Sequence, residues 1–421
     1  MCSPSTRQPP ALSREKMATI VAITLNVPGH LFPFVPVLRE LQRRGHAVSF
    51  ALCSYGNVPR AIDGIPIVQV SWPEGRRDAP IDNKPVFAAV PCVSDFAAFG
   101  EPLATPCAEL FIREQPDFLL VDPRLWGVMT AAEGSGIAWG SLAHNPLCFR
   151  GLGIDTRGPG WRPPCSWLDR ARQRALAFAM RIETADHLVE VNVVRLRRGL
   201  RRLASLTEME LLPPIILATT SEPFEYPRVD WPSGLTFVGP MIWDPPESEP
   251  LPTADARPTI LVAGSTIAQK GDTAKWADVV LSALAKEPYR VIATLPSEPV
   301  NSSTAGIVPH RAPQSHSAIL PTVTCVVCHG GPGIVQKALW FGVPVVAIPF
   351  GYDRFEVARR VEVANAGVML PFSELTAESV SQAVSCAIGC RAGAQAVMRQ
   401  FRASGGAPQA ADVIESRLPK S

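Results

Sequence analysis

Apolar and polar positions alternate along the chain in two successive series, each of which pairs short apolar runs with amphipathic stretches. In the first series, the apolar runs that we interpret as buried strands lie at 18–25, 46–52, 117–122, 137–142, 213–219 and 235–238. Between the first two runs, the stretch at 31–44 places its apolar residues at helical spacing, and Gly45 ends it. Further helical patterns occupy 127–134 and most of 168–206. Buried strands that alternate with helices predict a doubly wound parallel sheet.

A Pro-rich, acidic segment at 245–252 shows no periodicity and separates the two series. The second series restarts with an apolar run at 259–263 and repeats the alternation of strands and helices. A last amphipathic stretch at 407–418 is expected to form a helix that packs back across the domains. We therefore divide the chain into a disordered leader at 1–16, an N-terminal domain at 17–240, a linker at 241–256, a C-terminal domain at 257–402 and a terminal helix at 403–421.

The composition excludes several classes of function. The 421 residues are 47% hydrophobic and 19% charged, which is typical of a globular protein with room for two domains. A net charge of +2 gives no electrostatic basis for binding nucleic acid. No apolar run reaches about 18 residues, and 1–16 lacks the apolar core of a signal peptide, so we expect a cytoplasmic protein without a transmembrane segment. The 10 cysteines show no disulfide spacing, which indicates reduced thiols.

Two patterns suggest functions that we set aside. A basic cluster, which we interpret as a solvated helix face rather than a binding patch, contains Arg195, Arg197, Arg198, Arg201 and Arg202. Cys325, Cys328 and His329 have the spacing of a c-type haem attachment site, but they fall on a predicted buried strand in a chain without an export signal. We therefore expect neither haem nor a metal there.

A glycine-rich turn follows the apolar, β-branched run at 324–328. Gly330, Gly331 and Gly333 permit a tight turn that carries no Cβ toward a ligand. The helix that begins after them directs free backbone N–H groups at one place, which favours an anion such as a diphosphate. His329, at the end of the strand, is placed to add a donor to the same anion.

Four segments, in this order along the chain, resemble the signatures of family 1 glycosyltransferases. They are Pro-Gly-His-Leu-Phe-Pro at 28–33, Phe-Val-Gly-Pro at 237–240, Arg-Ala-Pro-Gln at 311–314 and His-Gly-Gly-Pro-Gly at 329–333, the last followed by Gly-Val-Pro at 342–344 and by Asp353. The resemblance covers nearly the whole chain. Within the family, the chain most resembles bacterial enzymes that glycosylate macrolides, enediynes and other natural products. It implies the GT-B fold, in which two doubly wound α/β domains face each other across a cleft.

The resemblance also implies a reaction. An inverting, metal-independent glycosyltransferase moves a hexose from a nucleotide diphosphate sugar, here UDP- or dTDP-linked, to a hydroxyl of a lipophilic small molecule. His30, in the first turn after a strand, is the expected base, since a histidine titrates near neutrality. Asp122 ends a neighbouring strand and is expected to orient the imidazole ring and stabilise its protonated form. No Asp-x-Asp pair appears in the sequence, so we expect no metal and no other cofactor.

The donor is expected in the C-terminal domain. The residues expected at the diphosphate are His329, Gly330, Gly331, Gly333, Ser265 and Thr266. Those expected at the nucleotide base are Arg311, Ala312 and Gln314, and those expected at the sugar are Asp353 and Arg354. The family usually stacks an aromatic side chain on the base, where this chain has Arg311, and three further positions depart from the family pattern. Ile334 stands where Thr or Ser is frequent, and Arg354 where Gln or Ser is common. Lys337 replaces a Glu that receives the ribose hydroxyls, and a lysine cannot accept a hydrogen bond.

The acceptor is expected against the N-terminal domain. The side chains proposed to line its wall, with a place in the core as the alternative for each, are Phe32, Phe96, Phe99, Trp126, His144 and Phe149. The expected partners are the nucleotide sugar and the acceptor, and the protein is expected to be a monomer or a homodimer. Two other functions stay open, a sugar-nucleotide 2-epimerase and a non-catalytic auxiliary protein that keeps the fold.

Overall fold

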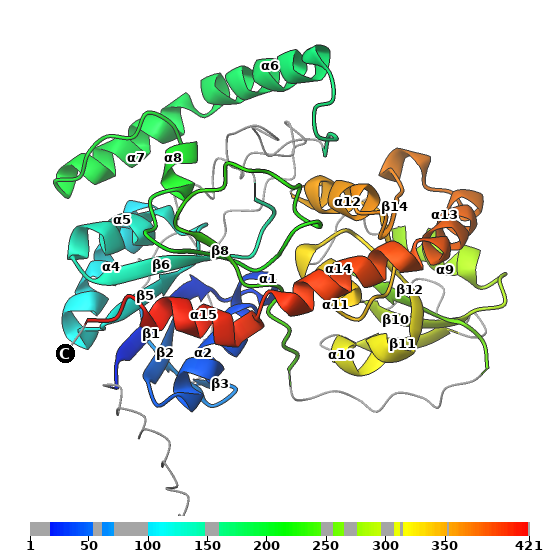
Figure 1. Cartoon of the computed structure of the whole chain (residues 1–421), viewed down its shortest axis with the longest axis horizontal. Helices are drawn as coiled ribbons and strands as arrows, with labels where there is room; N and C mark the ends of the chain where they lie inside the picture. The colour runs from blue at the N-terminus through cyan, green and yellow to red at the C-terminus, as the bar shows by residue number, and fades with distance from the viewer. Residues whose placement is uncertain are drawn as a thin grey trace, which may run out of the picture.

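The structure is a computed structural model that describes residues 17–53, 61–70, 100–147, 160–245, 256–264, 276–295, 307–311, 315–351 and 353–419, with the backbone alone at 183 and 307–311. Its helices and strands form two α/β units that lie side by side (Figure 1). Each unit is built on its own sheet. Among the residues described, no helix has both the length and the apolarity needed to cross a membrane.

The N-terminal unit contains an eight-stranded sheet in the order β3-β4-β2-β1-β5-β6-β7-β8. Its strands are β1 (Thr19–Leu25), β2 (Ala47–Cys53), β3 (Ala61–Ile62), β4 (Ile65–Val68), β5 (Phe118–Val121), β6 (Ala138–Ala143), β7 (Ile216–Ala218) and β8 (Leu235–Phe237). Its helices are α1 (Pro28–Leu31), α2 (Phe34–Arg43), α4 (Glu101–Glu114), α5 (Trp126–Ser135), α6 (Trp167–Glu183), α7 (Ala185–Arg197) and α8 (Thr207–Glu210). Neighbouring strands are parallel except for the β3–β4 pair.

The C-terminal unit contains a six-stranded parallel sheet in the order β11-β10-β9-β12-β13-β14. Its strands are β9 (Thr259–Ala263), β10 (Arg290–Leu295), β11 (Ile307–Arg311), β12 (Val323–Cys328), β13 (Val345–Ala347) and β14 (Gly367–Met369). Its helices are α9 (Trp276–Leu284), α10 (His316–Ile319), η2 (Leu320–Thr322), α11 (Pro332–Trp340), α12 (Arg354–Val363), η3 (Phe372–Glu374), α13 (Ala377–Gly389) and α14 (Arg391–Ala403).

The central strands are apolar because helices cover both faces of each sheet. Every residue of β5 and β9 is buried, as are the five inner residues of β1. Helix α2 turns Phe34, Leu38 and Leu41 into the core that one face of the sheet shares with it. The parallel strands therefore bring their carboxyl ends to one edge of each sheet, which is where ligands bind in folds of this class.

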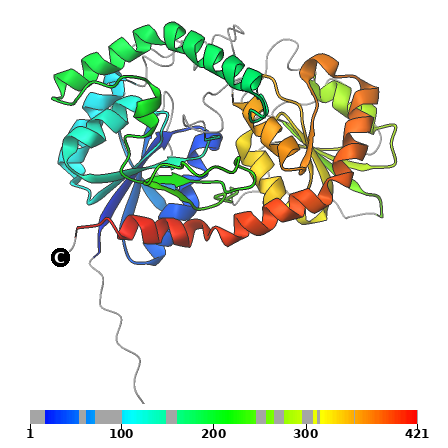
Figure 2. The ribbon, with the colours of Figure 1, turned by 45° about the horizontal axis from the view of Figure 1, so that its top comes forward.

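The last helix, α15 (Gly406–Glu415), leaves the C-terminal unit and packs on the N-terminal one. Figure 2 shows α14 and α15 in line along one side of both units. Ile414 is buried in the core that contains α2, and Arg44 at the end of α2 bonds Asp412 at 2.6 Å and Glu415 at 2.7 Å. His46 adds a contact of 3.0 Å to Glu415. Helix α15 is thus fastened to Arg44 and His46, the residues that connect α2 to β2 in the N-terminal unit.

A buried cluster of charges also joins the two units. Arg360, on α12, is fully buried and bonds Glu225 at 2.8 Å and Glu356 at 3.0 Å. Its remaining Nη2 donates to the carbonyl of Leu147 at 3.0 Å, and its guanidinium lies 4.5 Å from the ring centre of Tyr226. Because Glu225 and Leu147 belong to the N-terminal unit, this arginine ties α12 to the opposite domain. We call Arg360, Glu225 and Glu356 the interdomain clamp.

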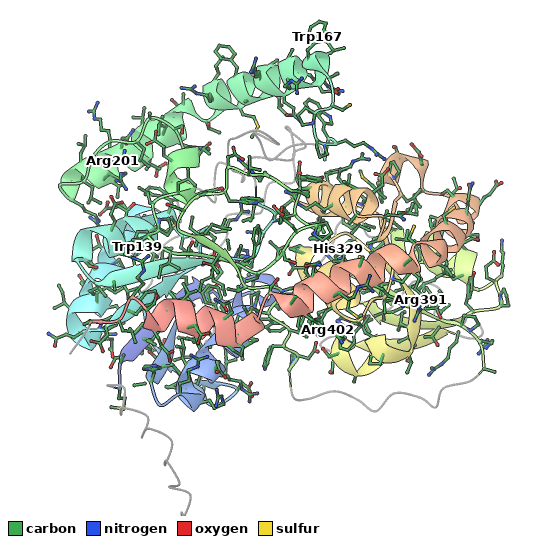
Figure 3. The ribbon with its side chains drawn as sticks, in the orientation of Figure 1. Trp139, Trp167, Arg201, His329, Arg391 and Arg402 are labelled. Atoms are coloured by element: carbon green, nitrogen blue, oxygen red, sulfur yellow. The ribbon has the colours of Figure 1, made fainter. Side chains whose placement is uncertain are left out.

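Helices α6 and α7 form a long arm, with α7 over the N-terminal unit and Trp167, at the start of α6, at the end that reaches toward the C-terminal unit (Figure 3). The sequence interpretation of its basic cluster as a solvated face is wrong for Arg195, which is fully buried. Its guanidinium bonds Glu133 at 2.6 and 2.9 Å and the carbonyl of Arg201 at 2.8 Å. A charge that pairs with a carboxylate and a carbonyl can be buried, which the sequence spacing alone did not indicate.

The predicted fold class is confirmed, with local differences. The helix expected at 31–44 is two helices, α1 and α2, that join at Phe32 and Pro33. The sequence pattern missed β3, β4 and β14, which have only two to four residues each, and it missed α14.

Candidate active site

His30 and Asp122 meet at the carboxyl edge of the N-terminal sheet. His30 lies in α1, the single turn that follows β1, and Asp122 follows the last residue of β5. Because β1 and β5 are adjacent and parallel, their ends converge, and His30 Nδ1 lies 2.7 Å from Asp122 Oδ2. The Asp122 side chain has no exposed surface, whereas that of His30 is 20% exposed. A ring with one nitrogen on a buried carboxylate and one edge toward solvent is arranged as a catalytic base requires.

Asp122 is held in its charged form by hydrogen bonds. Thr24 Oγ1 donates to Asp122 Oδ2 at 2.8 Å, and the backbone N–H of Arg124 donates to Oδ1 at 2.9 Å. Burial alone raises the pKa of the Asp122 carboxyl, but the charge and hydrogen bond of His30 hold it well below its usual range. Since a carboxylate only accepts, His30 presents its Nδ1–H to Asp122 and leaves Nε2 free to accept a proton.

His144 completes this cluster from β6, the next strand of the sheet. Its ring is 3% exposed and stands edge-on to His30, with 4.5 Å between ring centres. Its Nε2 lies 3.4 Å from Asp122 Oδ2. Burial lowers the pKa of His144 to about 4, although the Asp122 and Asp353 carboxylates act in the opposite direction.

The cluster is also the one group of potential metal ligands found among the described residues. One ligand atom from each of His30, Asp122 and His144 lies within 4.8 Å of the others. The 2.7 Å between His30 and Asp122 is the length of a charge-assisted hydrogen bond.

The glycine-rich turn lies at the corresponding edge of the C-terminal sheet, between β12 and α11. Gly330 has a φ of +81°, and a Cβ there would lie 3.2 Å from the carbonyl of Arg354. A Cβ on Gly331 would lie 2.5 Å from Nε2 of His329, so the imidazole packs against this glycine. Gly333 has no atom within 4 Å of its Cβ position. The first turn of α11 is therefore open at Gly333, and its backbone N–H groups are available to an anion.

His329 lies under this turn, on the side of the C-terminal unit that faces the N-terminal one (Figure 3). The ring is 8% exposed, and its Nδ1 is buried without a partner among the described residues. Burial, followed by the charge of Arg354, lowers the pKa of His329 to about 3. The Arg354 guanidinium in turn donates to the carbonyl of Phe350 at 3.0 Å and lies 4.8 Å from the centre of the Phe350 ring. The side chain of Arg354, which we expected at the sugar, is buried and packed beside the turn.

Lys337 is buried on α11 and pairs with Asp244, from the segment that we predicted as linker. The second oxygen of Asp244 accepts from the backbone N–H of Ser317 at 3.1 Å. Burial raises the pKa of Asp244, but the charge of Lys337 lowers it below its usual value. An acid is thus present at this end of α11 after all, supplied by a residue 93 positions away in the chain.

Several predicted site residues lie outside the described residues: Ser265, Thr266, Ala312, Gln314, Phe96, Phe99 and Phe149. Arg311 ends β11, and its backbone alone is described. Ile334, at the third position of α11, is partly buried against the C-terminal core. Asp353 is the residue that precedes α12.

Three of the side chains predicted to line the acceptor wall belong to the described residues. Trp126 is wrong as a wall residue, because it is 1% exposed and its ring fills the space in front of Gly100 in the core. Phe32 is half-buried and packs edge-on against Trp243, with 4.8 Å between ring centres. His144 lies beside Asp122 and His30 rather than on an apolar wall.

The thiols of Cys325 and Cys328 are buried in β12 as free cysteines. Burial raises the pKa of both thiols above the usual value, so both remain protonated. A buried, protonated thiol inside a strand is unsuited to attach haem or bind a metal.

Comparison with known proteins adds the following. Residues 279–417 match the family described as erythromycin biosynthesis protein CIII-like, C-terminal domain. The 4'-demethylrebeccamycin synthase of Lentzea aerocolonigenes is 28% identical over 397 residues, which cover 86% of this chain and 90% of that protein. The solved structure of the glycotransferase of kitacinnamycin has a TM-score of 0.73 at 18% identity and covers 96% of this chain and 100% of its own.

This chain is a glycosyltransferase with the GT-B fold. The comparisons confirm the resemblance to bacterial natural-product glycosyltransferases that the sequence motifs indicated. A further solved structure is the Streptomyces sp. SF2575 glycosyltransferase SsfS6 complexed with thymidine diphosphate, with a TM-score of 0.63, 18% identity and coverage of 95% of this chain and 99% of its own.

Sequence reasoning missed two residues of this glycosyltransferase's site, Thr24 and Asp244. It also missed the contact between His144 and the Asp122 carboxylate. Thr24 was detectable, because it is a hydroxyl near the carboxyl end of an otherwise apolar strand. The contact of His144 was not, because it depends on β1, β5 and β6 being consecutive in the sheet.

Proposed function

We propose that the protein transfers a hexose from a UDP- or dTDP-linked sugar to a hydroxyl of a lipophilic small molecule, with inversion and without a metal. The observation that carries the proposal is the 2.7 Å contact between His30, which is partly exposed, and Asp122, which is fully buried and charged. The thymidine diphosphate bound to a structural neighbour and the rebeccamycin-type relative support the donor and the class of acceptor.

In the proposed reaction, the acceptor hydroxyl gives its proton to His30 Nε2 as its oxygen forms a bond to the anomeric carbon. The bond between that carbon and the diphosphate oxygen breaks, and its electron pair leaves with the nucleoside diphosphate. Attack opposite the leaving group inverts the anomeric configuration. Asp122 stabilises the imidazolium that forms at His30, since an opposite charge beside a histidine favours its protonated form.

The leaving diphosphate is proposed to bind at the glycine-rich turn. The N–H groups that begin α11 and the guanidinium of Arg354 supply positive potential there. A bound diphosphate also favours protonation of His329, whose pKa is low while the site holds no anion, because a negative charge raises the pKa of a nearby histidine. The pair of Lys337 and Asp244 lies at the far end of the same helix, where the resemblance places the ribose.

The test is a thermal-shift titration with dTDP and UDP, followed by product analysis with the corresponding sugars. Binding to the folded state alone raises the melting temperature. Gly333→Ala is expected to fold normally, because no atom lies within 4 Å of the added Cβ, and to lose most of the ligand-induced shift. Gly389→Ala, also with free space around its Cβ but on α13, is the matched control and keeps the shift.

Turnover must then require an acceptor. A glycoside formed only when a lipophilic hydroxyl compound is present supports the transferase. Conversion of the nucleotide sugar without any acceptor indicates a 2-epimerase instead, and the absence of any shift with either nucleotide contradicts the donor site.

A further inference from the structure

His144 is an unusual neighbour for a catalytic carboxylate, because Asp122 already has a histidine partner. One oxygen, Oδ2 of Asp122, lies 2.7 Å from His30 Nδ1, 2.8 Å from Thr24 Oγ1 and 3.4 Å from His144 Nε2. The His144 ring is fixed between His30 on one side and Phe34, whose ring centre is 6.4 Å away, on another. The second imidazole is thus held at the carboxylate by packing as well as by its hydrogen bond.

The protonation state of His144 follows from its surroundings. The charged and titratable groups that act on it are Asp122, Asp353, His30 and Arg124. Burial outweighs the two carboxylates and keeps the ring neutral at physiological pH. A neutral imidazole carries one proton, and a carboxylate only accepts, so the proton of His144 is on Nε2. Its Nδ1 is then a buried acceptor without a partner among the described residues.

We propose that His144 is a positioning residue, whose Nε2–H holds the Asp122 carboxylate in the orientation that faces His30. The inference rests on the proposed function, because it gives that orientation its purpose. Three donors share an oxygen that has two lone pairs, so the longest contact, that of His144, is the one able to lengthen when His30 becomes an imidazolium and binds more tightly. His144 therefore restrains the carboxylate before the proton is transferred.

Neutrality is essential to this role. The negative charge of Asp122 stabilises one positive charge nearby, and the reaction creates that charge on His30. A protonated His144 would already occupy the carboxylate and would make protonation of His30 less favourable. The burial of His144 leaves the charge of Asp122 available to the base.

The competing role is a direct contact between His144 Nδ1 and the substrate, and two amides separate the roles. The side-chain nitrogen of glutamine reaches the place of His Nε2, whereas asparagine places its polar atoms near Nδ1. Positioning predicts that His144→Gln keeps kcat within about threefold and that His144→Asn and His144→Leu lower it about 10- to 100-fold, the scale of a misplaced catalytic group. KM for the donor and the acceptor is expected to change little in all three variants.

A pH profile gives a readout that a purely structural role does not affect. In His144→Leu, Asp122 loses one donor and attracts the imidazolium of His30 more strongly, so the acid limb of kcat/KM moves to higher pH. His144→Gln is expected to restore the wild-type profile. His187→Leu, which removes a buried histidine of α7, is the control for lost packing and keeps both kcat and the profile.

Three results overturn the inference. They are activity in His144→Asn with loss in His144→Gln, a change confined to KM, and unchanged kcat in His144→Leu. If His144→Leu does not fold, the comparison of the Gln and Asn variants still decides. If the wild type forms no glycoside from any nucleotide sugar, the proposed function fails, and that result is distinct from any pattern among the His144 variants.

Discussion

Asp122 and Glu225 are two buried carboxylates of the N-terminal domain, and they differ in what they bind. Each has almost no exposed surface, and each accepts a hydrogen bond of 2.7–2.8 Å from a basic side chain. Asp122 bonds the imidazole of His30, a side chain that is 20% exposed. Glu225 bonds Arg360, which is always charged and fully buried. Asp122 is therefore paired with a side chain that can exchange a proton, and Glu225 is paired with a permanent charge that holds α12.

The pKa of each carboxyl reflects the same difference. Burial raises the pKa of Glu225 above its usual value and outweighs the attraction of Arg360, and the charge of Glu356 adds to the rise. The pKa of Asp122 lies well below its usual value, because burial is outweighed by His30, with further help from Thr24 and the backbone of Arg124. Both carboxylates accept hydrogen bonds on both oxygens, but Asp122 has several side-chain donors of its own, whereas Glu225 shares the Arg360 guanidinium with Glu356.

The largest expected effect separates these two sites by amide substitution. Asp122→Asn is expected to lower kcat about 10²- to 10⁴-fold, because an amide can donate to Nδ1 and turn the proton of His30 toward the substrate. Its melting temperature is expected to stay close to the wild-type value. Steady-state kinetics with a donor chosen by thermal shift measure the effect.

Glu225→Gln is the matched control, since it makes the same change in the interdomain clamp. It is expected to keep kcat within about threefold, because its carboxylate touches no reacting atom. Equal losses of kcat in the two variants would mean that the clamp and the catalytic pair are not separate in function.

The next effect is on stability. Arg360→Met leaves Glu225 and Glu356 buried without their cation, which costs about 3–5 kcal/mol of folding free energy. Arg162→Met removes an exposed ion pair to Glu362, which lies on α12 like Arg360, and is expected to cost far less folding free energy. Denaturant unfolding of the two variants measures the difference, and similar losses would show that the clamp contributes no more than a surface pair.

The sequence predicted the elements of the two domains that depend on the spacing of neighbouring residues. The apolar run before His30, the helical spacing of α2 and the glycine-rich turn are local patterns, and each predicted its element. Helix α14 also has a local signal, with Ala394, Val397 and Phe401 on one buried face, which the sequence interpretation did not use.

The remainder depends on contacts between distant residues. Glu225 and Arg360 are 135 positions apart, and nothing near either residue shows that it is buried. Asp244 and Lys337 are also far apart in the chain, 93 positions from each other. From the sequence alone, Lys337 therefore indicated that the acid expected at the ribose was lost. Charge patterns were interpreted as solvated because most charges are exposed, and burial was possible here only through partners from other elements.

The smallest effect is a pH dependence of stability that arises from buried neutral histidines. Burial lowers the pKa of His144 and His316 to about 4 and that of His329 to about 3, from an unfolded value near 6.5. Below pH 6.5 the unfolded chain therefore binds more protons than the folded one, and stability falls as the pH falls toward 4. Each histidine contributes at most about 1.4 kcal/mol per pH unit.

Glu225 acts in the opposite direction, because its raised pKa lets the folded protein take up a proton before the unfolded chain does as the pH falls. Melting temperatures between pH 7 and pH 4 measure the sum. His316→Gln, which can still bond Thr294, is expected to reduce the slope by one histidine. A slope that is the same in this variant would show that His316 does not remain neutral in the folded protein.

We propose that His30 and Asp122 act as one catalytic unit on a nucleotide sugar. A double-mutant cycle with His30→Gln, Asp122→Asn and the combined variant tests it most directly, with kcat measured as release of nucleoside diphosphate in the presence of the acceptor. If the two residues form a unit, the double variant is as slow as His30→Gln alone, because Asp122 acts only through His30. If the losses multiply, the two residues act independently, and the account of the active site given above is wrong.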